Sequence, residues 1–379
     1  MTDLFADVSN NKDQGFGDKP PPPPEDTQQY NSPHLPGRIV YGLHSALLKT
    51  THIWRKPAGL PPQDLVKRLI VVQMERLGDT VLAEPALRAL RMFYPGAERT
   101  FIAPPFASAL YAGSGWGNIE PPEALNGFKK KFNGVDLLID LTSRVETKLA
   151  RNLGKSGIPY RVGLNRGGRG VYYTHSIKMP DLTIPTREIY LKLPGILGAQ
   201  PEDAIPRLPH GEDRLERGRN HWQKMDINNP VVLLPGAYYP SQRWSLEDFA
   251  TVAGVLKRKG LDVAVISGPG EEELGKDLSE QAGVPWKSAP PMVDFIDMLA
   301  TARIVVCNNT GPLHLAAALS VPTVSTMGPT VPWRWWPHSD APSIVFRGGS
   351  TGAVGNLEKI NPLEVAAAAL HLSDTISAD

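Results

Sequence analysis

The sequence contains a single cysteine, Cys307, among its 379 residues. One cysteine cannot form an internal disulfide, and chains poor in cysteine are typical of reducing compartments. Cys307 stands in the apolar run 303–307, so we expect a buried structural thiol and not a nucleophile.

Long apolar runs and an excess of charge are also missing. No stretch approaches the roughly 18 apolar residues that a transmembrane helix requires. Residues 1–13 carry acids and no apolar core, which excludes a secretory signal there. Lys and Arg number 40 against 39 Asp and Glu, so the net charge of +1 does not indicate a nucleic-acid binder. These features predict a cytoplasmic protein.

The sequence has no Asp-x-Asp pair, and no histidine or cysteine cluster has the spacing of metal ligands. Nothing in it therefore calls for a divalent ion, and we expect a protein without a metal or other cofactor.

Two N-terminal segments differ in composition from the rest of the chain. Residues 1–36 are polar and contain five consecutive prolines at 20–24, which predicts a disordered tail. That tail is either simply solvated or a polyproline II ligand for a partner domain. Residues 37–62 form a basic amphipathic segment, in which 38–56 carry four cations and no acid. This segment either lies on an anionic membrane, on the cytoplasmic face of the inner membrane, or packs onto the main body.

From residue 63 onward, short apolar runs of strand length alternate with amphipathic helices. The alternation occurs in two cycles, 63–200 and 211–379, joined by a proline-rich connection near 195–210. It predicts an α/β protein with two Rossmann-like domains facing a cleft, each a parallel sheet with helices on both faces. Ligands of such sheets bind at the carboxyl ends of the strands.

The first candidate site is the stretch 74–79, Met-Glu-Arg-Leu-Gly-Asp, directly after the first predicted strand. Gly78 permits a tight turn, and Asp79 begins a helix predicted over 79–94. The Asp79 carboxylate either caps that helix or accepts a proton from an acceptor hydroxyl.

Two further candidates open the second cycle. The loop 235–244 follows a predicted strand, and its backbone N–H groups suit phosphate oxygens, with Arg243 adding charge. Ser245, with Asp248 three residues later, is typical of a helix cap. The loop 267–272 lacks the third glycine of a dinucleotide fingerprint. Its acids, Glu271 and Glu272, either bind ribose hydroxyls or merely favour a first helical turn.

The most informative stretch is 308–314, Asn-Asn-Thr-Gly-Pro-Leu-His. A strand ends there, Asn309 or Thr310 caps the next helix, and Pro312 occupies its first turn. The unpaired N–H groups of such a helix start suit a diphosphate. His314 lies close enough to join that site, although a core histidine remains the alternative.

A basic stretch extends from Arg144 to Arg169, with seven cations and one acid. It indicates an anionic acceptor, such as a phosphorylated or carboxylated glycolipid, to which Lys129–Lys131 add. The alternative is an ordinary solvated face. The cations are Arg144, Lys148, Arg151, Lys155, Arg161, Arg166 and Arg169.

Together these motifs resemble glycosyltransferase family 9, which includes the ADP-heptose:lipopolysaccharide heptosyltransferases. The likeness extends from about residue 67 to the C-terminus. It implies a GT-B fold, an N-terminal acceptor domain, a C-terminal nucleotide-sugar domain, and metal-independent transfer with inversion at the anomeric carbon. The stretches that carry it are 76–79 with 85–88, 235–244, and 309–319 with 328–330.

The resemblance also implies roles for single residues. Asp79 matches the general base, and one of Glu271 or Glu272 matches the ribose contact. Contacts to the diphosphate and sugar correspond to Thr310, Gly311 and His314. Further donor-binding candidates are Gly236, Ala237, Gln242, Arg243 and Asn309, and acceptor-binding candidates are Arg76, Arg144 and Arg166.

Two residues depart from the family pattern. Gln242 stands where a lysine usually meets the donor phosphates, and Asn309 stands where an aspartate usually precedes the Thr-Gly pair. Losing a charged hydrogen-bond partner costs about 1.5–3 kcal/mol. Either Arg243 compensates, or the donor differs from ADP-heptose, or activity has decayed.

The sequence therefore predicts an inverting glycosyltransferase. It would move a heptose-like sugar from a nucleotide-sugar donor, ADP-heptose or another, to a glycolipid resembling the lipid A and core region of lipopolysaccharide. The alternative is a catalytically silent relative that binds glycolipid or a partner. A nicotinamide dehydrogenase is disfavoured by the missing third glycine.

Overall fold

The computed structural model describes residues 16–17, 59–126, 132–179, 183–348 and 355–378. The proline-rich tail 1–36 and the basic segment 37–62 lie almost wholly outside these residues, as do Lys129–Lys131. The described chain forms two compact units that divide between Ala204 and Ile205. No described helix is long and apolar enough to cross a membrane.

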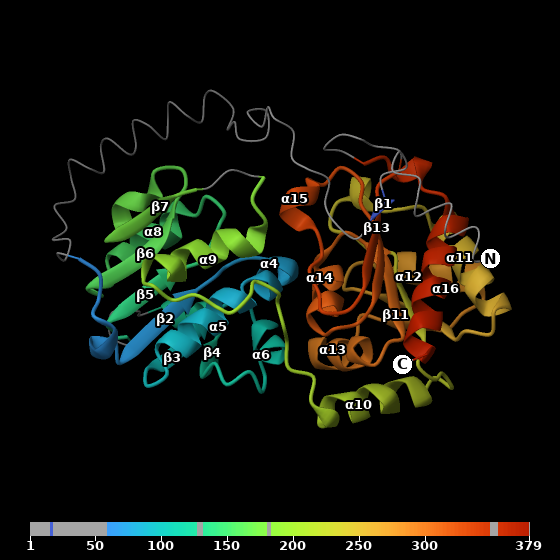
Figure 1. The fold of residues 1–379 in the computed structure, drawn as a ribbon, viewed down its shortest axis with the longest axis horizontal. Coiled ribbons are helices and arrows are strands. Elements are labelled where there is room, and N and C mark those ends of the chain that lie inside the picture. The colour runs from blue at the N-terminus through green and yellow to red at the C-terminus, as the bar shows by residue number, and fades with distance from the viewer. Residues whose placement is uncertain (1–15, 18–58, 127–131, 180–182, 349–354, 379) are drawn as a thin grey trace. The chain divides into compact units, whose positions relative to one another are not determined.

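The first unit contains one parallel sheet of six strands in the order β4-β3-β2-β5-β6-β7 (Figure 1). Its strands are β2 (Arg68–Val72), β3 (Glu98–Ile102), β4 (Asn118–Glu120), β5 (Leu137–Asp140), β6 (Tyr160–Asn165) and β7 (His175–Lys178). Its helices are α4 (Leu77–Leu82), α5 (Glu84–Phe93), α6 (Ala107–Leu110), α8 (Thr147–Gly154) and α9 (Thr186–Ile196).

The second unit contains six parallel strands in the order β13-β12-β11-β8-β9-β10, and β1 (Phe16–Gly17) pairs antiparallel with β13. The parallel strands are β8 (Val231–Leu234), β9 (Val263–Ser267), β10 (Trp286–Ser288), β11 (Ile304–Asn308), β12 (Thr323–Thr326) and β13 (Ser343–Phe346). The helices are α10 (Glu212–Gln223), α11 (Leu246–Arg258), α12 (Glu272–Ala282), α13 (Met292–Ala300), α14 (Gly311–Ala318), α15 (Pro332–Trp335) and α16 (Pro362–Ala378).

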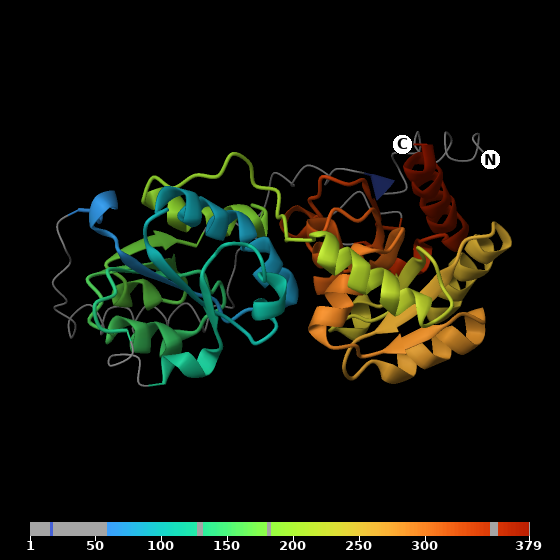
Figure 2. The same cartoon turned by 90° about the horizontal axis from the view of Figure 1, so that it is seen from below.

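The central strands of both sheets are buried on both faces, which explains why most of them read as continuous apolar runs. In β8, for example, Val231 and Leu233 pack into the core formed with α11, α12 and α16, while Val232 and Leu234, also buried, alternate with them. Helices lie on both sides of each sheet in Figures 1 and 2. The predicted pair of parallel sheets with helices on both faces is therefore confirmed.

The helix predicted over 79–94 is wrong in its extent, because the structure has two helices there. α4 begins at Leu77 and ends at Leu82, and α5 begins at Glu84. Pro85 has no N–H to donate and sits in the first turn of α5, where such a donor is not needed. The chain therefore starts a new helix at this point.

Cys307 lies in β11 with no exposed surface, and burial raises the pKa of its thiol. The prediction of a structural, unreactive cysteine fits this position.

Candidate active site

The turn after β2 lies at the carboxyl end of the first sheet. Val72, the last residue of β2, pairs with Ile102 of β3 and with Asp140 of β5. The loops that follow β2 and β5 therefore leave the sheet at the same edge. These two loops carry the first group of candidate residues.

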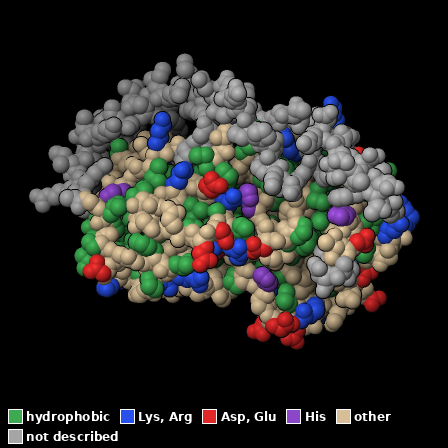
Figure 3. Space-filling view, viewed as in Figure 1, with side chains coloured by type: hydrophobic (Ala, Val, Ile, Leu, Met, Phe, Trp, Pro, Cys, Tyr) green, Lys and Arg blue, Asp and Glu red, His purple; other side chains and the backbone are tan. Residues whose placement is uncertain are grey.

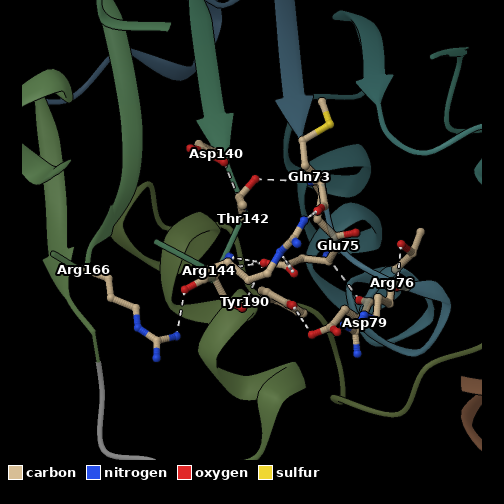
Figure 4. A network of polar contacts seen from close by, with 12 residues as sticks. Gln73, Glu75, Arg76, Asp79, Asp140, Thr142, Arg144, Arg166 and Tyr190 are labelled. Carbon is tan, nitrogen blue, oxygen red and sulfur yellow. Dashed lines mark hydrogen bonds and ion pairs between the residues drawn. The ribbon is translucent and has the colours of Figure 1, made fainter. Parts of the chain in front are cut away.

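Asp79 lies in the first turn of α4, but it does not cap that helix. The N-cap position is Arg76, whose side chain makes no capping hydrogen bond. The Asp79 carboxylate instead accepts a hydrogen bond from the Tyr190 hydroxyl on α9, with 2.7 Å between Oδ1 and the hydroxyl oxygen (Figure 4). Because α4 packs against α9, this bond links two helices that are far apart in the sequence. The capping alternative for Asp79 is therefore wrong.

Glu75 fixes the loop after β5 against the turn after β2 (Figure 4). One of its carboxylate oxygens accepts hydrogen bonds from the backbone N–H groups of Ser143 (2.7 Å) and Arg144 (2.9 Å). The other lies 2.8 Å from the Arg144 guanidinium Nε. The Glu75 side chain is 3% exposed and the Arg144 side chain 52%, so this charge-assisted contact is buried only on the Glu75 side.

Three arginines were predicted to bind an anionic acceptor, and the structure brings two of them to one loop. Arg144 is half-exposed and pairs with Glu75, while Arg166 donates from Nη1 to the Ser143 carbonyl at 3.0 Å. Arg76 is exposed at the start of α4. Arg76 thus lies in the turn that carries Asp79 and Arg144 beside that turn, while Arg166 lies farther from Asp79, on the other side of Arg144 (Figure 4).

The basic stretch 144–169 exposes fewer cations than its composition predicts, because two of its arginines are buried. Arg169 has no exposed surface and donates to the backbone carbonyls of Leu164, Arg144 and Thr142. Arg161 is 5% exposed and donates to the carbonyls of Tyr172 and Ile158. Both side chains hold loops together and do not form part of an anion-binding surface. On the face seen in Figure 3, cationic and anionic side chains are interspersed.

In the second unit, Asn308 fastens the loop after β8. Its side-chain amide donates to the carbonyl of Pro235 at 2.7 Å, and its Oδ1 accepts from the backbone N–H of Trp244 at 2.9 Å and from the Thr326 hydroxyl at 3.0 Å. The side chain is fully buried at the end of β11. One residue thereby sets both ends of the loop that carries Gly236, Ala237, Gln242 and Arg243.

The structure separates the two candidate ribose ligands. A Cβ atom placed on Gly236 would overlap the carboxylate of Glu271, so Glu271 turns across the loop after β8 and a side chain at 236 would displace that carboxylate. Glu272, in contrast, accepts from the backbone N–H of Gly270 at 3.1 Å within its own exposed turn. Glu271 is therefore the acid that lies at the loop after β8.

The side chains of Gln242 and Arg243 are both tied to neighbouring loops. Gln242 donates from Nε2 to the Thr330 hydroxyl at 3.1 Å, and Arg243 donates from Nε to the Ala237 carbonyl at 2.9 Å. Ser245 caps α11 by accepting from the N–H of Asp248, as its spacing predicts. Arg243 thus holds its guanidinium over the same loop as Gly236.

The turn before α14 also differs in detail from the expectation. Thr310 occupies the N-cap position, but its side chain makes no capping bond, and Asn309 donates its amide to the Trp335 carbonyl at 3.0 Å. An aspartate could not make this bond, because a carboxylate has no hydrogen to donate. The neutral amide at 309 therefore anchors α15.

His314 is buried in α14, and its ring lies 6.2 Å from that of Trp335. Burial lowers the pKa of His314 to about 4, so the imidazole is neutral near pH 7. Its Nδ1 is buried without a hydrogen-bond partner. Any help from His314 to a diphosphate would therefore be a hydrogen bond and not a positive charge.

Within the described ranges, no three His, Cys, Asp or Glu side chains come together as a group that could hold a metal ion.

Sequence reasoning missed four residues that the structure brings to these sites: Glu75, Tyr190, Asn308 and Trp335. Glu75 and Asn308 stand inside the motifs 74–79 and 308–314. Their position at or directly after the end of a predicted strand could therefore have identified them as candidates. Tyr190 and Trp335 act through contacts that no local pattern reveals, since Tyr190 is 111 residues from Asp79.

The chain is similar to proteins of known name along most of its length. It is 23% identical over 291 residues to lipopolysaccharide heptosyltransferase 3 of Escherichia coli K12, which covers 68% of this chain and 82% of that protein. Over a shorter stretch of 125 residues it is 29% identical to lipooligosaccharide heptosyltransferase 2 of Haemophilus influenzae, which covers 31% of this chain and 36% of that protein.

The fold matches a solved structure, that of E. coli ADP-heptose LPS heptosyltransferase II. The TM-score is 0.71 at 22% identity, and the match covers 82% of this chain and 99% of that one. This likeness confirms the expected GT-B fold. The sequence profile of glycosyltransferase family 9 (heptosyltransferase) matches residues 135–363, which is more than half of the chain. The chain therefore belongs to glycosyltransferase family 9, and it is a glycosyltransferase.

Proposed function

We propose that this glycosyltransferase moves a heptose-like sugar from a nucleoside diphosphate donor to an anionic glycolipid resembling the lipopolysaccharide core, with inversion at the anomeric carbon. The names of its relatives support this class of donor and acceptor. The observation that carries the proposal is the Asp79 carboxylate, held by Tyr190 in the turn after β2.

In the proposed reaction, Asp79 is the general base. An acceptor hydroxyl oxygen attacks the anomeric carbon, its proton passes to the Asp79 carboxylate, and the bond from that carbon to the diphosphate oxygen breaks. The diphosphate leaves with the bonding electron pair. Base catalysis of this kind contributes about 10²–10⁴-fold to a rate.

The donor contacts are assigned to the second unit. We assign the diphosphate to the N–H groups at Thr310–Gly311 and to Arg243, because a helix start and a guanidinium both favour an anion. Glu271, lying across Gly236, is assigned to the ribose hydroxyls, which donate to a carboxylate. Gln242 and His314 complete this set as neutral hydrogen-bonding groups.

The acceptor is assigned to the first unit. Arg144 follows Ser143, whose carbonyl accepts a hydrogen bond from Arg166, and Arg76 stands at the start of the helix that carries Asp79. Guanidinium groups recognise phosphate and carboxylate in paired hydrogen bonds. We therefore assign these three arginines to the anionic groups of the acceptor, beside the hydroxyl that reacts.

The base is tested with Asp79→Asn, which keeps the size of the side chain and removes the carboxylate. With ADP-heptose and a core-truncated lipopolysaccharide acceptor, we expect turnover to fall at least 100-fold while the affinity for ADP is unchanged. Near-normal turnover in this variant would refute the base assignment. No ADP, GDP or UDP binding by the unaltered chain would favour the catalytically silent alternative instead.

A further inference from the structure

Tyr190 is the buried neighbour of the proposed base. Its side chain has no exposed surface, and its hydroxyl oxygen lies 2.7 Å from Asp79 Oδ1 (Figure 4). It belongs to α9, which packs against both α4 and α5. A buried ring cannot move without disturbing that packing, so the hydroxyl is held in place by the core of the unit.

The hydrogen of this contact resides on the tyrosine. Burial, with the nearby carboxylates of Asp79 and Glu75, raises the pKa of Tyr190 well above its usual value. The phenol therefore stays protonated near neutral pH, and it donates to Asp79. A hydrogen bond to the charged form of a carboxyl group favours that form.

Other ionisable groups surround α4 from the elements packed against it. Glu75 is compensated by Arg144 at 2.8 Å, and Glu84 of α5 by Arg88 at 3.1 Å. The ionisable groups on or beside the elements that contact α4 are Glu75 and Arg76 before it, Arg144 of the neighbouring loop, Glu84, Arg88 and Arg91 of α5, Tyr111 after α6, and Arg187, Glu188 and Lys192 of α9.

We propose that Tyr190 is a positioning residue for the transfer reaction, which orients the Asp79 carboxylate and favours its ionised form. This inference rests on the proposed function, because it gives Asp79 the part of the base. The acceptor proton still passes to Asp79, and Tyr190 keeps its own. By favouring the ionised form of Asp79, Tyr190 would thus set the pH at which the enzyme becomes active.

The same unit offers a matched control in Tyr111. It is also buried, and its hydroxyl donates over 2.7 Å to the backbone carbonyl of Thr80, the residue after Asp79. Each tyrosine therefore holds α4 through one hydrogen bond from its hydroxyl, and the two bonds are equally long. Only the Tyr190 hydroxyl contacts the Asp79 carboxylate. Tyr111→Phe therefore removes a comparable hydrogen bond to α4 without removing a hydrogen bond to that carboxylate.

The first measurement needs no substrate. The full chain is labelled with ¹³C at aspartate carboxyl carbons and titrated by NMR, and the resonance lost in Asp79→Asn identifies Asp79. We expect Tyr190→Phe to move the midpoint of that resonance upward by about one pH unit, and Tyr111→Phe to leave it in place. An unmoved midpoint in Tyr190→Phe, or equal movement in both variants, would overturn the inference.

The second measurement is turnover against pH, with ADP-heptose and core-truncated lipopolysaccharide. The acid limb of kcat/KM reports the essential base of the free enzyme. In Tyr190→Phe we expect it to move upward by about one pH unit, while KM for the donor is unchanged. If Asp79→Asn abolishes turnover and the limb of Tyr190→Phe does not move, the inference fails and the proposed function stands. If Asp79→Asn remains active, the base assignment fails, and the inference fails with it.

Discussion

At the scale of single residues, the candidate sites depend on groups whose chemistry is set by burial. The Asn309 amide holds α15 through a bond that the family's usual aspartate could not make. The substitution therefore has a structural reason in this chain. It need not mark lost activity, which was one of the alternatives left open by the sequence.

His314 leads to a prediction about acid stability. Burial lowers its pKa in the folded protein from 6.5 to about 4. Between these values the unfolded chain binds the proton and the folded chain does not, so stability is lost as the pH falls from about 7 to 4. The imidazole contributes up to about 3 kcal/mol to that loss.

The test is the free energy of unfolding in urea at pH 7 and at pH 4. We expect His314→Gln to lose about 3 kcal/mol less than the unaltered chain over this interval. His371→Gln, at an exposed position of α16, is the control and should follow the unaltered chain. Equal acid losses in all three proteins would show that His314 is not buried in its neutral form.

At the scale of helices and strands, most central strands were predictable and the outer strands were not. β8 begins and ends where the apolar run 231–234 does, because a strand covered on both faces is commonly apolar throughout. The outer strands β4, β7, β10 and β13 were missed, since each has only three or four residues and the first three are partly exposed. The break between α4 and α5 was missed because the apolar period continues across it.

Asn308 gives a prediction at this scale, because it joins β11, the loop after β8 and the start of α11. In Asn308→Ala, the Trp244 N–H loses its buried partner and the Pro235 carbonyl loses a donor. Leaving such groups unsatisfied costs about 1–3 kcal/mol each. We expect the free energy of unfolding to fall by about 2–4 kcal/mol and nucleotide affinity to fall with it.

Thr326→Val is the matched control, since it removes one hydroxyl from the same Asn308 oxygen and leaves the loop bonds intact. We expect it to cost only about 1 kcal/mol and to leave ADP affinity unchanged. Urea denaturation and calorimetric titration measure the two quantities. Equal effects of the two substitutions would mean that Asn308 does not hold the donor loop.

At the scale of the whole molecule, the sequence could predict that there are two sheets, but not which side chains meet within each unit. Parallel strands bring their carboxyl ends to one edge, and the loops at 73–79 and 141–144 lie there as neighbours. The Tyr190 contact depends on how α9 packs on α4, which no periodicity specifies. Glu271 could be distinguished from Glu272 only through the space above Gly236.

The assignment of the donor to the second unit leads to the last prediction, which hydrogen exchange of the full chain can test. A ligand that binds only the folded state at 100 times its Kd stabilises it by about 2.7 kcal/mol. With saturating ADP, we expect slower exchange at 235–244, 268–272 and 309–314, because these loops leave the same edge of the sheet. Gly236→Ala should reduce this protection, since its Cβ would displace the Glu271 carboxylate that is assigned to the ribose. Gly254→Ala, within α11 where a Cβ meets only the end of the flexible Arg258 side chain, should retain it. Unchanged exchange at all three loops, in a chain that binds ADP, would place the nucleotide elsewhere.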